Sequence, residues 1–435
     1  MKKLCVCFLA AIIFAAVSSI TVAADTHSDM PDLTLANSVY VYNLESGLEV
    51  CSKNPEEPTP PAGTAKLMTA IIAYEYYKDD FSRVITVPEE AVKMTVGNSI
   101  DLSAGEEVTV DELLTALIAG GANDAANTFA IEIAGDIESF CDMMNQKAVE
   151  IGAHNTVYKN ACGIDSDAMV TTAKDTSLIV AYAYKLPGFR EYASVTRYVM
   201  EKTNKSSRRV IHNRNYLLST HIETKYYDPD AIGMNTGFTQ NGGFCTVSVA
   251  EKGGLTYIFV VMNAVKDANG DNSSFYIISD LIDWTLKSFG YITVLDPSTI
   301  VREVPVSLAK NVDYVIVSPE SKVEYFLPLD TDVSSEISYE INLDSKVLTA
   351  PIYEGQKVGT IDVVYKGSTI AAVSLVTKNN ISASTFLRML DYCKNLLKSR
   401  QVKIALTVFA ILFVSYLILS YIQFTRSHKN KNRRK

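Results

Sequence analysis

The chain has 435 residues, of which 48% are hydrophobic and 20% charged, so it can form one to three packed domains and is not a disordered protein. Its formal net charge is −9; residues 1–24 contribute +2 and residues 383–435 contribute +10, so residues 25–382 carry −21. Such an acidic body argues against a nucleic-acid-binding protein.

Residues 1–24 have the pattern of a secretory signal peptide. Lys2 and Lys3 precede an apolar run, and small residues close the segment at Val22-Ala23-Ala24. This order of positive charge, apolar core and small residues predicts export and cleavage before Asp25. The alternative is a membrane anchor that stays in place.

Residues 25–295 are predicted to form one α+β domain, with an antiparallel sheet flanked by helices. Alternating apolar residues predict one strand hairpin over 38–51 and a second over 244–263, the second turning at Lys252-Gly253-Gly254. Helical spacing predicts a series of helices between the two hairpins and one after them, over residues 64–77, 108–120, 125–134, 143–151, 172–184 and 275–289.

Residues 296–380 read differently, as short strands separated by turns. Candidate strands lie at 314–317, 323–327, 337–341, 357–365 and 369–375, and no segment has convincing helical spacing. We therefore expect a small, β-rich second domain.

The end of the chain has the features of a membrane anchor. Residues 381–402 place apolar side chains at helical spacing with basic residues between them, which predicts an amphipathic helix beside a membrane. Residues 403–424 are long and apolar enough to span a bilayer, and the tail 425–435 is strongly basic. Because basic tails stay in the cytoplasm, we expect a single C-terminal span, an extracytoplasmic body and a short cytoplasmic tail. A buried core helix is the alternative for 403–424.

The cysteines and histidines form no recognisable ligand set. Five of the seven cysteines lie beyond the predicted signal peptide, at scattered positions and without a C-x-x-C pair. We expect buried free thiols, no disulfide framework, no metal site and no cofactor.

Three short segments have the frame of a serine acyl-transferase in which the reactive residue is replaced. Gly63 stands where S-x-x-K has its serine, three residues before Lys66. Gly121 stands where S-x-N has its serine, before Asn123, and Asn235 stands for the lysine of K-T-G, before Thr236 and Gly237. In such enzymes the serine begins a helix and the lysine one turn later takes its proton, while the other two motifs line the opposite walls.

With further matching segments, the chain resembles the serine D-Ala-D-Ala carboxypeptidases, which are low-molecular-weight penicillin-binding proteins of peptidase family S11. The resemblance covers about residues 36–290, and 300–378 resembles the C-terminal domain of that family. It rests on Pro61-Ala62, Met68-Thr69, Asn123-Asp124-Ala125-Ala126, Met144-Asn145, Asn155-Thr156, Gly163, Thr236-Gly237-Phe238-Thr239 and Gly243-Phe244. It implies a role in cell-wall peptidoglycan metabolism and a stem peptide as ligand.

The resemblance also assigns roles that the present residues lack. Glycine at 63 offers no nucleophile, so no acyl-enzyme can form there. The family commonly holds the substrate carboxylate with an arginine beyond K-T-G, and this chain has none between Arg214 and Arg302. The catalytic positions Gly63, Lys66, Gly121 and Asn123 and the substrate-binding positions Asn235, Thr236, Gly237 and Phe238 are nevertheless expected to line one cleft; backbone amides near Gly63 and Phe238 would form an oxyanion hole.

We therefore predict a membrane-anchored, non-catalytic relative that binds stem peptides or a protein partner. One alternative is an active carboxypeptidase with a displaced nucleophile such as Thr64, and another is a purely structural or interaction module. For the surviving residues, the structural alternatives are a solvated or paired Lys66, a helix N-cap at Asn123 and an edge-strand turn at Thr236-Gly237. If only the reactive side chains were lost, serines at 63 and 121 with lysine at 235 would restore acylation by penicillin.

Overall fold

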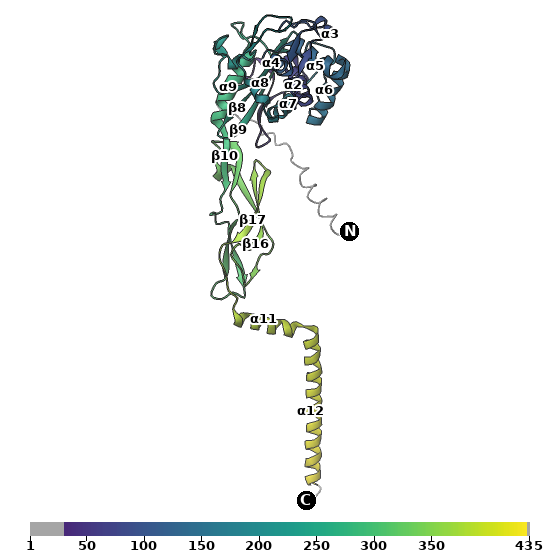
Figure 1. The fold of residues 1–435 in the computed structure, drawn as a ribbon. Helices are drawn as coiled ribbons and strands as arrows, with labels where there is room; N and C mark the ends of the chain where they lie inside the picture. Colours follow the sequence, from purple (N-terminus) through teal and green to yellow (C-terminus); the bar gives the residue numbers. More distant parts are fainter. Residues whose placement is uncertain (1–29, 433–435) are drawn as a thin grey trace. The chain divides into compact units, whose positions relative to one another are not determined.

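The structure is a computed structural model that describes residues 30–432. The predicted signal peptide and the last residues of the basic tail lie outside the described part. The chain divides into two compact units, one comprising residues up to Tyr291 together with Phe326–Asp330, and the other Ile292–Tyr325 together with the residues from Thr331 onward. Figure 1 shows the elements of both units.

A five-stranded antiparallel sheet forms the centre of the first unit. Its strand order is β2-β1-β9-β8-β7, so β7 is an edge strand. The strands are β1 (Ala36–Asn43), β2 (Leu48–Lys53), β7 (Ala231–Thr239), β8 (Gly243–Lys252) and β9 (Leu255–Ala264). Both predicted hairpins are present, because β1 pairs with β2 and β8 pairs with β9.

The two faces of this sheet belong to two separate hydrophobic cores, as β9 illustrates. Its residues Ile258, Val260 and Met262 pack with the helices around α2, whereas Tyr257, Phe259 and Val261 pack with α9. Successive side chains of a strand point to opposite faces, so a continuous apolar run is what a strand covered on both sides requires.

Helices cover both faces of the sheet. Nearly every residue of α2 (Ala65–Tyr76) is buried, and α9 (Ser273–Ser288) begins at Asn272, whose side chain accepts a hydrogen bond from the Ser274 amide. The other helices of this unit are α3 (Glu89–Lys93), α4 (Val110–Ile118), α5 (Asn123–Ala134), α6 (Ile137–Ile151), α7 (Ala173–Lys185) and α8 (Phe189–Ser194). Three short 3₁₀ turns accompany them: η1 (Ala62–Thr64), η2 (Tyr216–Leu218) and η3 (Thr224–Tyr226).

Within residues 30–432, three two-stranded sheets lie outside the large sheets. They pair β3 (Val84–Thr86) with β4 (Glu107–Thr109), β5 (Arg197–Met200) with β6 (Arg209–His212), and β10 (Phe289–Leu295) with β13 (Val323–Pro328).

The second unit is built on a six-stranded sheet, as the strand-rich pattern predicted. Its order is β14-β16-β17-β12-β11-β15, with β11 (Arg302–Ser307), β12 (Tyr314–Pro319), β14 (Ile337–Leu343), β15 (Leu348–Thr349), β16 (Lys357–Tyr365) and β17 (Ser368–Thr377). The expectation that this region lacks any helix was wrong in one detail. A single helical turn, α10 (Val333–Glu336), begins at Asp332, whose carboxylate accepts from the Ser334 amide.

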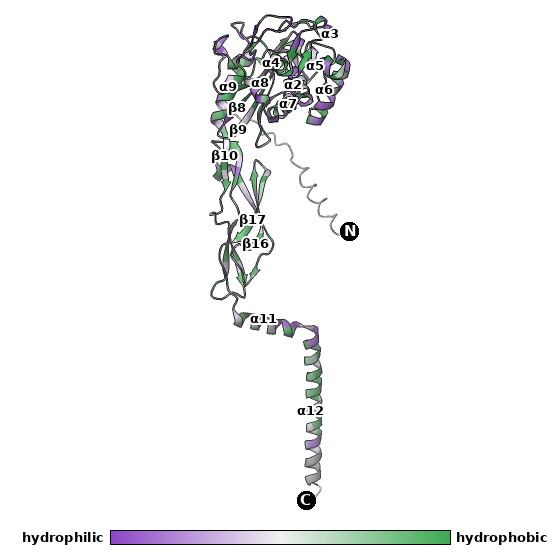
Figure 2. Cartoon of the chain, viewed as in Figure 1, coloured by the Kyte–Doolittle hydropathy of each residue, from purple (hydrophilic) through white to green (hydrophobic). Residues whose placement is uncertain are grey.

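Two helices end the chain. No residue of α11 (Thr385–Lys398) is buried, and its apolar and basic residues alternate at helical spacing. In α12 (Arg400–Asn432), the stretch Arg400–Gln423 contains an 18-residue window with a mean hydropathy of 2.4, and it is long and apolar enough to cross a membrane. Figure 2 shows the apolar colouring along α12.

Four of the five cysteines beyond the predicted signal peptide are buried free thiols, as expected. The fifth, Cys393 on α11, is exposed, so the prediction of burial was wrong for this residue.

Candidate functional site

The turn that precedes α2 carries the two positions of the first motif. Gly63 lies in η1, and Lys66 lies in the first turn of α2. The Lys66 side chain is only 6% exposed, and its Nζ donates a hydrogen bond to the Cys162 carbonyl oxygen at 2.7 Å. The ammonium group of Lys66 is therefore held by a backbone carbonyl.

Gly63 is pressed against the edge strand β7. A Cβ atom built on Gly63 would lie 2.7 Å from Gly237 Cα and 2.8 Å from the Thr236 carbonyl oxygen, distances that real Cβ atoms do not show. A Cβ on Gly237 would collide with the Gly63 backbone in turn. The first and third motifs thus meet backbone against backbone, and this contact leaves no room for a side chain at residue 63.

The second motif is held by a loop that precedes it in sequence. Asn98 donates from Nδ2 to the carbonyl oxygens of Gly120 and Gly121 at 2.7 and 2.8 Å, and the Asn123 amide donates to the Asn98 carbonyl oxygen at 2.8 Å. Gly121 has φ +63°, a conformation that glycine adopts at little cost and serine does not. Hydrogen bonds in both directions therefore fix the loop at Asn98 and the motif at 121–123 relative to one another.

The alternative of Asn123 as a helix N-cap was wrong. The N-cap of α5 is Ala122, and Asn123 is the first helical residue. Its Nδ2 donates to the Val96 carbonyl oxygen at 2.6 Å, while its buried Oδ1 has no hydrogen-bond partner among the described residues. A buried acceptor without a partner is rare in folded proteins, and this one belongs to a residue that lines the cleft.

The third motif lies within β7 rather than in a turn, so the alternative of an edge-strand turn was also wrong. Asn235 is 2% exposed, and its Nδ2 makes only a long bond of 3.4 Å to the Ile118 carbonyl oxygen. The Thr236 hydroxyl lies 2.9 Å from the Thr246 hydroxyl. Phe238 is 60% exposed and its ring packs on that of Phe244, with ring centroids 4.6 Å apart.

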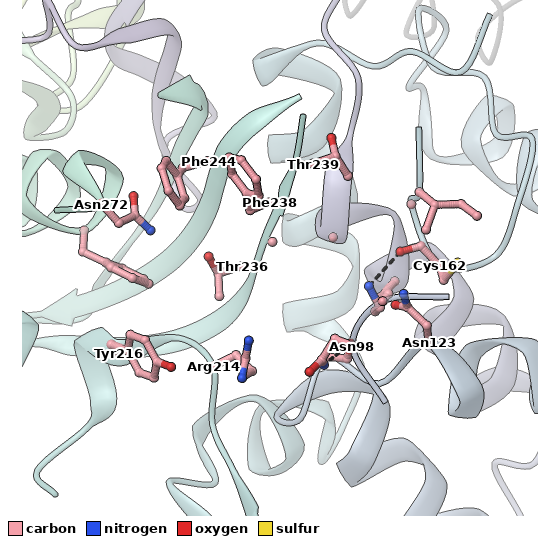
Figure 3. A pocket seen from close by; sticks show the side chains of 18 residues that line it. Asn98, Asn123, Cys162, Arg214, Tyr216, Thr236, Phe238, Thr239, Phe244 and Asn272 are labelled. Carbon is pink, nitrogen blue, oxygen red and sulfur yellow. Dashed lines mark hydrogen bonds between the residues drawn. The ribbon is translucent and has the colours of Figure 1, made fainter. Parts of the chain in front are cut away.

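These motif positions surround one cavity of about 370 Å³. Of the predicted site residues, Asn235 alone does not line it. The cavity is lined by Gly63, Lys66, Gly97, Asn98, Gly121, Asn123, Cys162, Gly163, Ile164, Arg214, Tyr216, Thr236, Gly237, Phe238, Thr239, Phe244, Asn272 and Phe275. In the view of Figure 3, Asn98, Asn123 and Cys162 lie on one side, Phe238, Phe244 and Tyr216 on the other, and Arg214 between them.

The cavity is cationic and has no acidic residue in its lining. The pKa of Lys66 is lowered from its usual 10.5 to about 8, mainly by burial and in smaller part by the charge of the nearby Arg214. Arg214 is exposed, and its guanidinium pairs with no carboxylate in the part of the chain that the structure describes. Two cations without an acid between them favour an anionic ligand.

Sequence reasoning missed Arg214, since it looked for a carboxylate-binding arginine only after K-T-G. The signal was the polar run Asn213-Arg214-Asn215, directly before η2. The buried amides of Asn213 and Asn215 anchor this run: Asn213 donates to the carbonyl oxygens of Ala193 and Val195, and Asn215 Nδ2 to that of Val247. Arg214 is thereby directed to the cavity by its neighbours.

The substitute nucleophile that was considered, Thr64, does not line the cavity. Its hydroxyl donates to the Pro61 carbonyl oxygen at 2.6 Å and is buried. Ser99 and Ser103 do not line it either; the Ser99 hydroxyl bonds to Asp101. The only hydroxyl groups in the lining are those of Thr236, Thr239 and Tyr216.

Comparisons with known proteins give one consistent result. Residues 25–266 match the D-alanyl-D-alanine carboxypeptidase family, and residues 289–383 match the C-terminal domain of penicillin-binding protein 5. The sequence is 26% identical to D-alanyl-D-alanine carboxypeptidase DacF of Bacillus subtilis over 82% of this chain and 88% of that protein. It is 27% identical to DacC of Escherichia coli over 85% of this chain and 90% of that protein.

Solved structures agree on the fold. The crystal structure of the D-alanyl-D-alanine carboxypeptidase DacD from Francisella tularensis superimposes with a TM-score of 0.61 at 23% identity, covering 82% of this chain and 95% of that one. Penicillin-binding protein 5 from Haemophilus influenzae gives 0.58 at 24% identity, over 81% and 99% of the two chains.

Proposed function

The chain belongs to the D-alanyl-D-alanine carboxypeptidase family. We propose that it is a membrane-anchored protein that acts in peptidoglycan metabolism and binds stem peptides without forming an acyl-enzyme. The observation that carries this proposal is the contact of Gly63 with Gly237, which fills the place of the nucleophile with backbone. The hydrogen bond from Lys66 to the Cys162 carbonyl supports it, since the side chain that the resemblance assigns as the base contacts backbone and no hydroxyl group.

The remaining cavity supports binding rather than turnover. Lys66 and Arg214 supply positive charge for a peptide carboxylate, and the unpartnered Oδ1 of Asn123 offers an acceptor for a peptide N–H. The rings of Phe238 and Phe244 provide an apolar wall. These features suit a short anionic peptide, and a stem peptide has that chemistry.

Covalent labelling tests the loss of chemistry. The full-length protein in neutral detergent is incubated with a fluorescent penicillin, denatured and run on a gel beside an active carboxypeptidase of the family. We expect a band for the active enzyme and none for this protein. A band that survives denaturation would refute the proposal, and peptide mapping of the adduct would identify a displaced nucleophile.

Calorimetric titration with a stem tetrapeptide or pentapeptide tests binding. Arg214→Ala and Asn123→Ala should each weaken binding about tenfold, since a charge-assisted or buried hydrogen bond contributes about 1.5 kcal/mol or more. Lys159→Gln, which removes an exposed lysine that does not line the cavity, is the matched control. Absence of measurable binding by the parent protein would leave the purely structural alternative.

The membrane attachment is part of this proposal. The apolar helix α12 would span the bilayer, and the amphipathic α11 before it would lie at the head groups. Cys393 on α11 is the exposed thiol of the described residues, so an impermeant maleimide reports its side of the membrane in intact cells. We expect Cys393 to be labelled without lysis of the cells. In the variant Ser427→Cys, Cys393→Ser, the only thiol of interest lies in the tail, and we expect labelling only after lysis. The reverse result would refute this topology.

A further inference from the structure

A hairpin beside the cavity is strongly basic, although the body of the protein is acidic. The basic hairpin, residues 197–214, contains β5, β6 and the tip between them. It has six lysine or arginine residues and one acid, Glu201, whereas residues 25–382 as a whole carry −21. The charge of this segment is therefore opposite to that of its surroundings.

Five of the six cations of the hairpin form no ion pair within the described chain, which sets them apart from many others in the unit. Lysines and arginines elsewhere, such as Lys147, Lys174 and Arg190, pair with glutamates. Within the described chain, no carboxylate lies within ion-pair distance of any of the four exposed cations Arg197, Lys202, Lys205 and Arg208. The remaining free cation of the segment, Arg214, lines the cavity.

The hairpin tip is held in a fixed shape rather than left as a loose loop. Glu106, fully buried, pairs with Arg209 and accepts a hydrogen bond from the Thr203 hydroxyl at 2.8 Å. Asn204 donates to the Gly105 carbonyl oxygen at 2.9 Å and accepts from the Glu107 amide at 2.8 Å. The buried Glu106 is thus paired within the fold, and its bonds hold the hairpin that carries the exposed cations.

From this arrangement we propose that the basic hairpin is a docking site for a linear phosphodiester polymer outside the membrane. The tip consists only of Lys, Arg, Ser, Thr and Asn between Lys202 and Arg208, and these are the side chains that contact phosphate oxygens. The tip has no apolar or aromatic residue to serve as the core of a protein interface. A flat anionic lipid surface would also repel the acidic body, whereas a flexible polymer reaches one hairpin alone.

The polymer would be held by charge, so its binding should fall steeply with salt. The test uses the full-length protein in neutral detergent and poly(glycerol phosphate) as probe, with affinity measured over a series of salt concentrations. The triple variant Lys202→Gln, Lys205→Gln, Arg208→Gln removes three cations whose side chains make no hydrogen bond within the described chain. The control Lys78→Gln, Lys159→Gln, Lys185→Gln removes three exposed lysines outside the hairpin and so changes the net charge equally.

We expect the hairpin variant to bind at least about tenfold more weakly at low salt, with a salt slope lower by about two to three, and the control to stay within about twofold of the parent. Equal weakening in both variants would show that net charge alone attracts the polymer and would overturn the proposal. Equally tight binding of polyglutamate, or displacement of the polymer by phosphatidylglycerol vesicles, would overturn it too. Stem-peptide binding should be unchanged in both variants, so this result is independent of the cavity's function.

Discussion

A serine placed at residue 63 should not bring about acylation, and it should destabilise the fold. In Gly63→Ser the new Cβ would lie 2.7 Å from Gly237 Cα and 2.8 Å from the Thr236 carbonyl oxygen. Both neighbours are backbone atoms of β7, which pairs with β8 along its length and cannot yield as a flexible side chain would. Either η1 or the edge strand must move.

The size of the effect follows from two opposing contributions. Overpacking a well-packed site costs about 1–3 kcal/mol. Replacing glycine also restricts the unfolded chain, which offsets about 0.4–1 kcal/mol of this cost. We expect a net loss of about 1–2 kcal/mol in unfolding free energy, which for a domain of this size lowers the melting temperature by about 2–4 °C per kcal/mol.

The assay combines thermal unfolding with fluorescent-penicillin labelling of the parent, Gly63→Ser and Gly63→Ala proteins. The alanine variant carries the same Cβ without a hydroxyl, so both variants should lose similar stability and neither should be labelled. The triple variant with Gly121→Ser and Asn235→Lys should remain unlabelled as well, contrary to what the motifs alone suggested. A Gly63→Ser protein that is acylated and as stable as the parent would refute the reasoning.

Three further predictions concern the other motif positions. Gly121→Ser places a side chain at φ +63° and should lower the unfolding free energy, measured with urea, by about 1 kcal/mol. Gly121→Asn should cost less, because asparagine tolerates this conformation. Equal stability of both variants and the parent would contradict this prediction. The pKa of Lys66 is lowered to about 8 in the folded protein. Between about pH 8 and the usual pKa of 10.5, the unfolded chain therefore binds a proton that the folded chain lacks, and the contribution of Lys66 to stability rises with pH. The difference in unfolding free energy between Lys66→Met and the parent should therefore change with pH in denaturant unfolding. It should favour the variant by about 1–3 kcal/mol more at pH 8 than at pH 10.5. A difference that does not change with pH would show that the ammonium is not desolvated. The unfolding free energy of Asn235→Leu should stay within about 1 kcal/mol of the parent, because the buried Oδ1 of Asn235 has no hydrogen-bond partner among the described residues. Asn213→Leu breaks three hydrogen bonds and should cost about 2 kcal/mol or more. Similar losses in both variants would argue that water satisfies Asn235.

Local sequence patterns predicted the secondary structure well where one periodicity dominates. The strand β9 and the helix α2 are both largely apolar, and most of their residues are buried. Prediction was weaker at element ends. Asn123 has a good capping side chain, but the Val96 carbonyl takes its amide group, and Ala122 caps α5 by backbone geometry alone. Cys393 was expected to be buried, but it is exposed and no residue of α11 is buried.

The sequence predicted which motif positions would form the candidate site, but not how the side chains and backbone would be arranged around the cavity. Motif order brought Gly63, Lys66, Gly121, Asn123 and Thr236 to one cavity, as the family frame implies. The frame did not indicate Arg214, because its position depends on the buried asparagines on either side. It also did not indicate which way Asn235 would turn, and this residue lies outside the cavity lining.

The sequence by itself determined which atoms this protein lacks: no hydroxyl at residues 63 and 121 and no ammonium at 235. Only the tertiary structure decided what lies beside Gly63, because van der Waals contact between η1 and β7 joins residues more than 170 positions apart. A position without a side chain can border a cavity or have backbone packed against it, and the packing of the surrounding backbone selects between them. Here the backbone closes at Gly63 and leaves a cationic cavity beside it.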